Sequence, residues 1–272
     1  MDKIRYILTI AGSDSVGGAG IQADIKTIFS LGHYAASAVT AVTAQNTCGV
    51  RKIQAVDADV LTAQIDAVLE DIPIDTIKIG MIYTKENVLA IRQSLHKNNF
   101  NGNIVLDPVL VATSGDSLAK TDFVKALATQ LMPICTVLTP NISEAQAIAE
   151  IKITNTDDMT RAAQIIIEKY HCQNVLVKGG HSISNKMTDV LVTNKGNCKK
   201  FELAKINSQN THGTGCTLSS AIATYLATGL PLEQSVEQAK TYVYNAILAA
   251  KDIELGHGHG STNHFHSLTI KK

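Results

Sequence analysis

The sequence predicts an α/β protein whose mostly parallel central sheet is covered by helices on both faces. Short runs rich in Val, Ile and Leu recur along the chain without polar alternation, as expected for strands buried on both faces. Amphipathic stretches with helical spacing separate these runs, and such alternation is typical of a parallel sheet. Neither a linker nor a repeat interrupts the 272 residues, so residues 1–272 are expected to form one domain.

The order of these patterns predicts the individual elements. The predicted strands are the apolar runs at 6–11, 36–44, 76–80, 104–106, 136–138 and 175–178. The first predicted helices lie between them at 21–31, 60–71, 85–98, 122–131 and 159–170. The expected N-caps of the last four helices are Asp57 or Asp59, Thr84, Thr121, and Asp157 or Asp158.

The pattern changes after Lys178. Two short apolar runs, at 189–193 and 199–203, flank the turn sequence Asn-Lys-Gly-Asn and predict a β-hairpin. Helices are predicted at 216–228 and 232–250, followed by an unusual tail rich in histidine and glycine.

Composition limits the classes of partner. With 24 basic and 24 acidic residues, the formal net charge is zero, which gives no electrostatic reason to expect nucleic acid or an anionic membrane. No apolar run approaches the ~18 residues of a membrane span, and the N-terminus lacks a signal-peptide pattern. The five cysteines form no C-x-x-C pair and fit reduced thiols, so the sequence predicts a cytoplasmic protein.

A glycine-rich segment from Ala11 to Asp24 follows the first predicted strand. Its spacing misses the G-x-G-x-x-G fingerprint and no Gly-Lys-Ser/Thr closes it, which excludes a dinucleotide fingerprint and a P-loop. The glycines favour a loop whose backbone approaches a ligand, although a flexible turn would have a similar composition. Asp24 fits either a solvated helix residue or a substrate hydrogen-bond acceptor.

Three polar groups follow later strands. Asn141 and Glu144 are three apart at a predicted helix start, so they suit either a hydrated magnesium ion and phosphate or a simple helix cap. Asp107 follows the strand at 104–106 and could reach a cation. Lys178 precedes two glycines and fits a phosphate-binding charge as well as a lysine extending from the rim.

The segment Asn210 to Ile222 predicts an anion site. Its glycine-flanked turn leads into a helix, so backbone N–H groups and the helix dipole point at one position. Cys216 at this helix start is a candidate base, because the same N-terminus would lower a thiol pKa. Inert packing, a metal ligand and a covalent nucleophile with His212 are the alternatives for this cysteine.

Taken together, these residues resemble the hydroxymethylpyrimidine/phosphomethylpyrimidine kinase family, the thiamine-pathway branch of the ribokinase-like superfamily. The resemblance covers the whole chain, and several motifs occur in the family's order. They are Thr9-Ile10-Ala11-Gly12-Ser13-Asp14, Gly17-Gly18-Ala19-Gly20-Ile21-Gln22-Ala23-Asp24, Thr43-Ala44-Gln45-Asn46-Thr47, Lys78-Ile79-Gly80-Met81, Thr139-Pro140-Asn141 with Glu144, Lys178-Gly179-Gly180-His181, Asn210-Thr211-His212-Gly213-Thr214-Gly215-Cys216-Thr217, and Gly256-His257-Gly258 with His264-Phe265. The match of the tail argues against a metal site or a purification tag.

The resemblance implies a three-layer α/β/α sandwich that transfers the γ-phosphate of ATP, with Mg²⁺, to a small pyrimidine. It implies that the substrate is bound by Gln45, Asp24, Met81 and the backbone at Gly12 and Ala19. It implies that ATP is bound by Lys178, Thr211 and Asn141, and magnesium by Asp107, Glu144 and Asn141. The catalytic residues that it implies are Lys178, the anion hole at Gly213, Thr214 and Gly215, and Cys216 as the base. Because the family is often dimeric, a homodimer is expected.

Two other functions fit parts of the pattern. A pyridoxal or pyridoxine kinase of the same fold would act on a substrate of similar size, but Gln45 favours an aminopyrimidine because an amide can pair with a ring nitrogen and an amino group. A non-catalytic binding protein would not need the anion loop, Lys178 and Cys216 together. Either segment 12–20 or segment 109–118 is expected to become ordered over bound substrate.

Overall fold

The computed structural model describes residues 3–110, 121–180 and 186–268, and in them a nine-stranded sheet has the order β3-β2-β1-β4-β5-β6-β7-β8-β9. The strands are β1 (Tyr6–Asp14), β2 (Tyr34–Asn46), β3 (Gly49–Ala55), β4 (Thr76–Ile79), β5 (Asn103–Leu106), β6 (Val137–Leu138), β7 (Asn174–Val177), β8 (Lys186–Thr193) and β9 (Cys198–Ala204). The six strands β2, β1, β4, β5, β6 and β7 run parallel to one another, while β3, β8 and β9 pair antiparallel at the two edges. The mostly parallel sheet is thereby confirmed.

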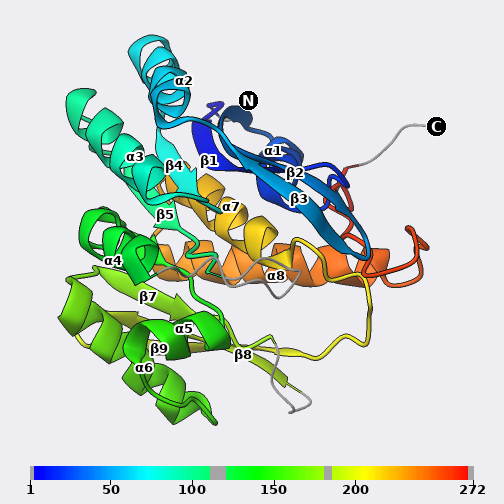
Figure 1. Cartoon of the computed structure of the whole chain (residues 1–272). Helices are drawn as coiled ribbons and strands as arrows, with labels where there is room; N and C mark the ends of the chain where they lie inside the picture. Colours follow the sequence, from blue (N-terminus) through cyan, green and yellow to red (C-terminus); the bar gives the residue numbers. More distant parts are fainter. Residues whose placement is uncertain (1–2, 111–120, 181–185, 269–272) are drawn as a thin grey trace.

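Helices cover both faces of the sheet and make the three layers (Figure 1). The helices are α1 (Gly20–Ser30), α2 (Ala58–Asp71), α3 (Lys85–Lys97), α4 (Thr121–Gln130), α5 (Ile142–Ala149), α6 (Thr156–Tyr170), α7 (Thr214–Ala227) and α8 (Leu232–Ala250), with a short 3₁₀ helix at Met132–Ile134. Helices α2 to α6 contribute to the hydrophobic cluster on one face, and α1, α7 and α8 to the cluster on the other.

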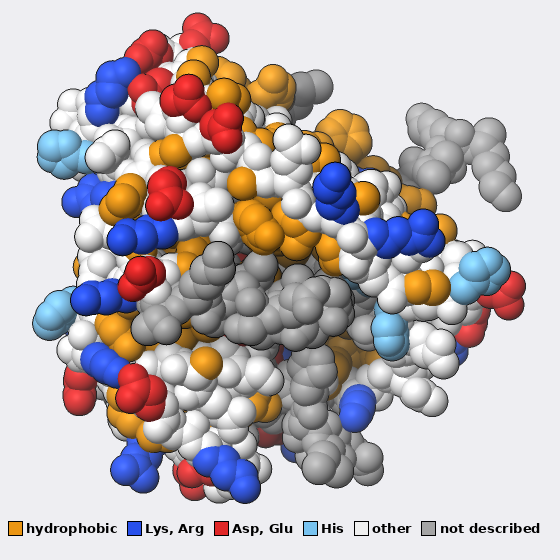
Figure 2. Space-filling model, viewed as in Figure 1, with side chains coloured by type: hydrophobic (Ala, Val, Ile, Leu, Met, Phe, Trp, Pro, Cys, Tyr) orange, Lys and Arg blue, Asp and Glu red, His pale blue; other side chains and the backbone are white. Residues whose placement is uncertain are grey.

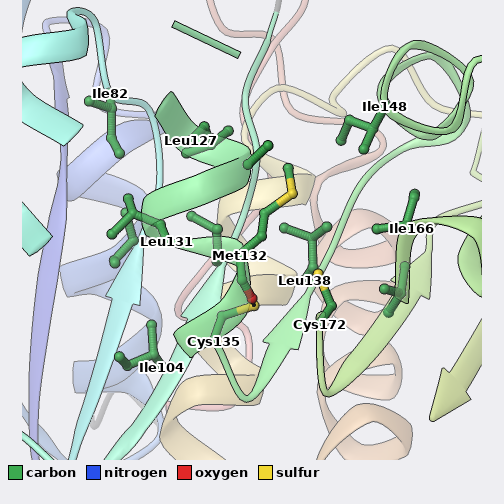
Figure 3. Packing of buried hydrophobic residues seen from close by; sticks show 14 of the residues in the cluster. Ile82, Ile104, Leu127, Leu131, Met132, Cys135, Leu138, Ile148, Ile166 and Cys172 are labelled. Atoms are coloured by element: carbon green, nitrogen blue, oxygen red, sulfur yellow. Dashed lines mark hydrogen bonds between the residues drawn. The ribbon is translucent and has the colours of Figure 1, made fainter. Parts of the chain in front are cut away.

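The larger cluster includes side chains from the connections as well as from the helices. Figure 3 shows Met132 and Cys135 of the segment before β6 packing near Leu138 and Cys172. All four side chains are buried. Side chains from the connections thus pack with those of the two-residue strand β6 and bury it in the larger cluster.

The order of the strands reverses at β1: the next strands in sequence, β2 and β3, lie on one side of it, and β4 and the later strands lie on the other. Ligands of open α/β sheets bind beyond the carboxyl ends of the strands at such a switch point. The residues that follow β4, β5 and β7 at this edge include Met81, Asp107 and Lys178.

Most predicted elements are confirmed within a few residues, including the hairpin of β8 and β9. Strand β3 was not predicted, and the helix start predicted at Asn141 is confirmed as the start of α5. Among the predicted caps, Thr84 accepts a hydrogen bond from Asn87 N at 3.1 Å, and Asp57 is an N-cap whose side chain makes no capping bond.

Two cap predictions are wrong. Helix α6 is capped by Asn155, whose side chain accepts from the backbone N–H of both Asp157 and Asp158, so these two acids lie inside the first turn. Thr121 is already the first residue of α4. Both errors come from placing the helix start too late, because apolar periodicity begins only after the first polar turn.

The surface carries mixed charge. Figure 2 shows basic and acidic side chains interspersed over the viewed face. None of the helices in the described part of the chain is long and apolar enough to cross a membrane.

Candidate active site

Two cavities meet at the N-terminus of α7. The larger has a volume of about 510 Å³, and the predicted site residues that line it are Asn141, Lys178, Thr211, Thr214 and Gly215. The smaller has a volume of about 110 Å³, and the predicted site residues that line it are Gly12, Ala19, Gln45, Met81 and Cys216. Adjacent residues of one helix thus line each cavity, which places α7 between two binding spaces.

The loop before α7 is held by a close backbone contact. Gly213 is the N-cap of α7 with φ of 84°, and a Cβ added there would lie 1.8 Å from the carbonyl oxygen of Gly18. Only glycine therefore lets the first glycine-rich loop and the anion loop pack against each other. Helix α7 has no side-chain cap, so its first turn is suited to binding an external anion.

Lys178 reaches the same helix start from β7. Its Nζ lies 2.6 Å from Asp107 Oδ1, and a Cβ added at Gly215 would lie 3.3 Å from that Nζ. Burial opposes the charged forms, but the mutual attraction of the pair outweighs it, raising the pKa of Lys178 and lowering that of Asp107. The cavity therefore holds a charged lysine close to an uncapped helix N-terminus.

Asn141 and Glu144 form a capping box at the start of α5. Asn141 Oδ1 accepts from Glu144 N at 2.9 Å, and Glu144 Oε2 accepts from Asn141 N at 2.8 Å. An isolated parallel bridge pairs Asn141 with Lys178, so this cap lies beside that lysine. Burial raises the pKa of Glu144 to about 7, although the charge of Lys178 opposes the shift.

Two carboxylates near Lys178, those of Asp107 and Glu144, could hold magnesium. The charges of both raise the pKa of Lys178, and the charge of Asp107 also raises the pKa of Glu144. Among the described residues no group of three or more His, Cys, Asp or Glu side chains could hold a metal. This donor set fits Mg²⁺, which is commonly bound by one or two carboxylates together with substrate phosphates and water.

Asp24 does not line either cavity. Its carboxylate and the ammonium of Lys78 form an ion pair at 2.8 Å, and both side chains are 0 % exposed. Thr9 Oγ1 and Ser220 Oγ donate to the same carboxylate at 2.6 and 2.7 Å. Asp24 thus links α1 to β1, β4 and α7, and its oxygens are already hydrogen-bonded.

Cys216 lines the smaller cavity and is half-buried. The prediction that the helix start lowers its pKa is wrong for this structure. Burial raises the thiol pKa to about 11, and the charges of Asp24 and Asp107 add to this effect. Lys78 and the backbone N–H of Gly20 oppose the shift but do not outweigh it.

Asp14, Lys78 and His212 form contacts around the smaller cavity that the sequence did not predict; His212 was considered only as a partner base for Cys216. Asp14 accepts from Gly18 N at 3.1 Å and from Ala19 N at 2.8 Å, and its Oδ2 lies 2.9 Å from His212 Nε2. Although burial opposes it, the hydrogen bond with His212 and those from the backbone lower the pKa of Asp14. His212 Nε2 also lies 3.4 Å from the amide nitrogen of Gln45.

Lys78 is the third of these residues, through its pair with Asp24. The position of Asp14 at the end of β1 could have indicated that it belongs to the site. Nothing local in the sequence pairs Asp14 with His212, which is 198 residues away. His181 of the Lys178 motif and most of segment 109–118 lie outside the described residues.

Comparison with known proteins shows the family of the chain. The model of the phosphomethylpyrimidine kinase family matches residues 14–263. A hydroxymethylpyrimidine/phosphomethylpyrimidine kinase of Rhizobium meliloti (strain 1021) is 46% identical over 260 residues, which are 95% of this chain and 96% of that protein.

Solved structures extend the comparison to the fold. The phosphomethylpyrimidine kinase from Clostridium difficile 630 is 42% identical with a TM-score of 0.78, over 90% of this chain and 100% of that one. A pyridoxal kinase from Staphylococcus aureus in complex with AMP-PCP and pyridoxal is 30% identical with a TM-score of 0.87, over 99% and 96% of the two chains. The α/β/α sandwich is therefore of the ribokinase-like type, and the chain belongs to the phosphomethylpyrimidine kinase family.

Proposed function

We propose that the chain transfers the γ-phosphate of ATP to 4-amino-5-hydroxymethyl-2-methylpyrimidine, and then a second phosphate to the resulting monophosphate, for thiamine biosynthesis. The observation that carries this proposal is the meeting of a large and a small cavity at the uncapped start of α7. Phosphoryl transfer needs a donor and an acceptor held on either side of a site that neutralises charge.

ATP is assigned to the larger cavity. Lys178 and Thr211 would approach its phosphates, and the backbone at Gly213, Thr214 and Gly215 would receive the developing negative charge. The apolar side chains of β9, α7 and α8 that line the same cavity suit an adenine base.

The pyrimidine is assigned to the smaller cavity. Gln45 would pair with the ring nitrogen and the amino group, and Met81 would pack on the ring between the backbone at Gly12 and Ala19. Asp24 would act beneath this cavity by holding Lys78, and not through a direct substrate contact.

Cys216 is proposed as the base. It would take the proton of the acceptor hydroxyl as that oxygen bonds to the γ-phosphorus and the bond to the ADP oxygen breaks. Only the thiolate can accept this proton, so the raised thiol pKa makes the rate rise with pH above neutrality.

Magnesium would be held by Asp107 and Glu144, with the amide of Asn141 beside them. A bound Mg²⁺ neutralises charge on the ATP phosphates. A cytoplasmic location and a homodimer, both expected from the sequence, complete the proposal; light scattering of the purified chain tests the dimer.

Pyridoxal kinase activity is the second candidate, favoured by the fold similarity to the Staphylococcus aureus pyridoxal kinase. The test is the release of ADP with the hydroxymethylpyrimidine, with its monophosphate and with pyridoxal as acceptors. We expect turnover with both pyrimidines, and loss of that turnover in Lys178→Met. Turnover with pyridoxal alone would replace the proposal by the second candidate.

A further inference from the structure

The histidine- and glycine-rich tail crosses both loops of the active site. Residues 256–264, which we call the C-terminal strap, follow α8 and lie beside the ends of β2 and β3 in Figure 1. Neither cavity is lined by the histidines of the strap. Its contacts are to the loops that carry the predicted substrate and phosphate contacts.

At one end the strap binds the turn between β2 and β3. Thr47 Oγ1 accepts from His257 N at 3.2 Å and from Gly258 N at 3.1 Å, and Thr47 O accepts from His259 N at 3.0 Å. A Cβ added at Gly258 would lie 2.1 Å from Thr47 O, so the two backbones touch. Thr47 is two residues beyond Gln45, so these bonds hold the end of the strand that carries the amide.

At the other end the strap binds the anion loop. Gly260 O accepts from His212 N at 3.1 Å. His264 Nε2 lies 3.1 Å from Thr217 Oγ1, and that hydroxyl donates to Gly213 O at 2.8 Å. When this hydroxyl donates to Gly213 O, the imidazole Nε2, which also lies 3.3 Å from Thr262 Oγ1, acts as the donor to Thr217. His264 is thereby linked through one hydroxyl to the N-cap of α7.

The strap is itself fixed to α8. Asn263 N donates to Ala246 O at 3.1 Å, and Tyr242 OH donates to His264 O. His264 is 2 % exposed. A segment anchored in this way can hold two loops at a set separation, whereas a loosely attached tail could not.

We propose that the C-terminal strap sets the separation between Gln45 and the anion loop, which makes Thr47, Gly258 and His264 positioning residues for phosphoryl transfer. The inference rests on the proposed function. Its physical basis is that transfer requires the acceptor oxygen within about 3–3.5 Å of the phosphorus, and that an error of about 1 Å can reduce the rate about 100-fold.

The test compares strap variants with a matched control. Thr47→Val removes one hydroxyl that accepts from backbone N–H groups, and Thr193→Val removes a comparable hydroxyl in the turn between β8 and β9, where it accepts from Asn197 N at 3.2 Å. His264→Ala removes the donor to Thr217, and His264→Gln supplies an amide donor at a similar reach.

We expect Thr47→Val and His264→Ala each to lower kcat/KM for the pyrimidine by about tenfold, with KM for ATP changed less than about twofold. His264→Gln should recover most of the loss, and Thr193→Val should resemble the unmodified chain. Strap variants that only melt at lower temperature, with kcat/KM for the pyrimidine unchanged at 20–25 °C, would overturn the inference. Equal losses for both substrates would do the same.

Hydrogen exchange separates this inference from the proposed function, because it needs no turnover. In Thr47→Val we expect faster amide exchange at residues 210–217, and in His264→Ala faster exchange at residues 43–50. Faster exchange confined to the loop next to the mutated residue would overturn the inference about the strap, even if the chain phosphorylates the pyrimidine. If each variant speeds exchange in the opposite loop but the chain does not phosphorylate the pyrimidine, the strap still connects the two loops and the proposed function is refuted.

Discussion

Cys216 lies at the boundary between the two cavities, and its surroundings oppose ionisation of the thiol, contrary to what its position at a helix start implies. A helix N-terminus stabilises a thiolate, but here burial disfavours the charged form, and the carboxylates of Asp24 and Asp107 act in the same direction. Lys78 supplies the main opposing charge.

The base role gives the first prediction. Cys216→Ala should lower kcat by about 10²- to 10⁴-fold while leaving the Kd for ATP nearly unchanged, because the variant loses proton transfer but keeps the anion loop. Steady-state kinetics and nucleotide titration measure the two quantities. Cys198→Ala, which removes an exposed cysteine from β9, is the control. A kcat near that of the unmodified chain in Cys216→Ala would remove the base assignment.

Gln45 gives the second prediction. Gln45→Leu preserves size but removes both hydrogen-bonding groups of the amide, so KM for the pyrimidine should rise by about tenfold or more, while KM for ATP stays within about twofold. Kinetics at saturating concentrations of the other substrate measure each value. Similar increases for the two substrates would place Gln45 outside the acceptor cavity.

The sequence was informative about these residues because strand ends converge. Gln45, Met81, Asp107 and Lys178 each lie near or just beyond the end of a parallel strand, and parallel strands end at one edge. Partners of buried charges could not be predicted, because Lys78 and Asp24 are 54 positions apart and nothing local in the sequence pairs them.

At the scale of elements, the long periodic helices and the apolar strands were predictable, and short or polar elements were not. Strand β3 is an edge strand without a fully buried residue, and only the start of α5, which has eight residues, was predicted. Helix starts were also placed too late, as α6 illustrates.

The corrected cap of α6 gives the third prediction. Asn155→Ala removes the acceptor of two backbone N–H groups, so it should lower the free energy of unfolding by about 1 kcal/mol. Asp157→Asn is the control and should change that free energy by less than about 0.5 kcal/mol. Urea unfolding measures both. Equal losses in the two variants would contradict the assignment of Asn155 as the cap.

The burial of His264 gives the fourth prediction. Burial lowers its pKa to about 4, and the nearby charges of Lys26, His212 and His266 contribute in the same direction. The unfolded chain binds this proton below about pH 6.5, whereas the folded chain does not until about pH 4. The stabilising contribution is therefore complete above pH 6.5 and is lost progressively as the pH falls towards 4.

The measurement is the difference in free energy of unfolding between the unmodified chain and His264→Gln, taken at several pH values. It should decrease by about 3 kcal/mol between pH 7 and pH 4, because one pKa unit corresponds to about 1.4 kcal/mol. Taking the difference cancels other groups that titrate in this range, such as Glu144. A difference that is independent of pH would show that His264 is protonated equally in both states.

At the scale of the whole molecule, the mostly parallel sheet and its helical layers followed from the alternation of patterns along the chain. The strand order could not be derived in that way, since it depends on which strands pair across long separations. The loop after β1 and the loop before α7 are far apart in the sequence but in contact in the fold. β1 lies between β2 and β4, where the strand order reverses, and glycine at position 213 permits the close contact with Gly18.

The central claim is that the smaller cavity selects an aminopyrimidine alcohol and presents it to ATP across the start of α7. The most direct measurement is a competition in which equal amounts of the hydroxymethylpyrimidine and pyridoxal are incubated with the chain, ATP and Mg²⁺, and the phosphorylated products are identified by mass spectrometry. The account predicts that the pyrimidine monophosphate appears first, is followed by the diphosphate, and exceeds pyridoxal phosphate throughout. Pyridoxal phosphate as the main product, or a pyrimidine that is never phosphorylated, would contradict it.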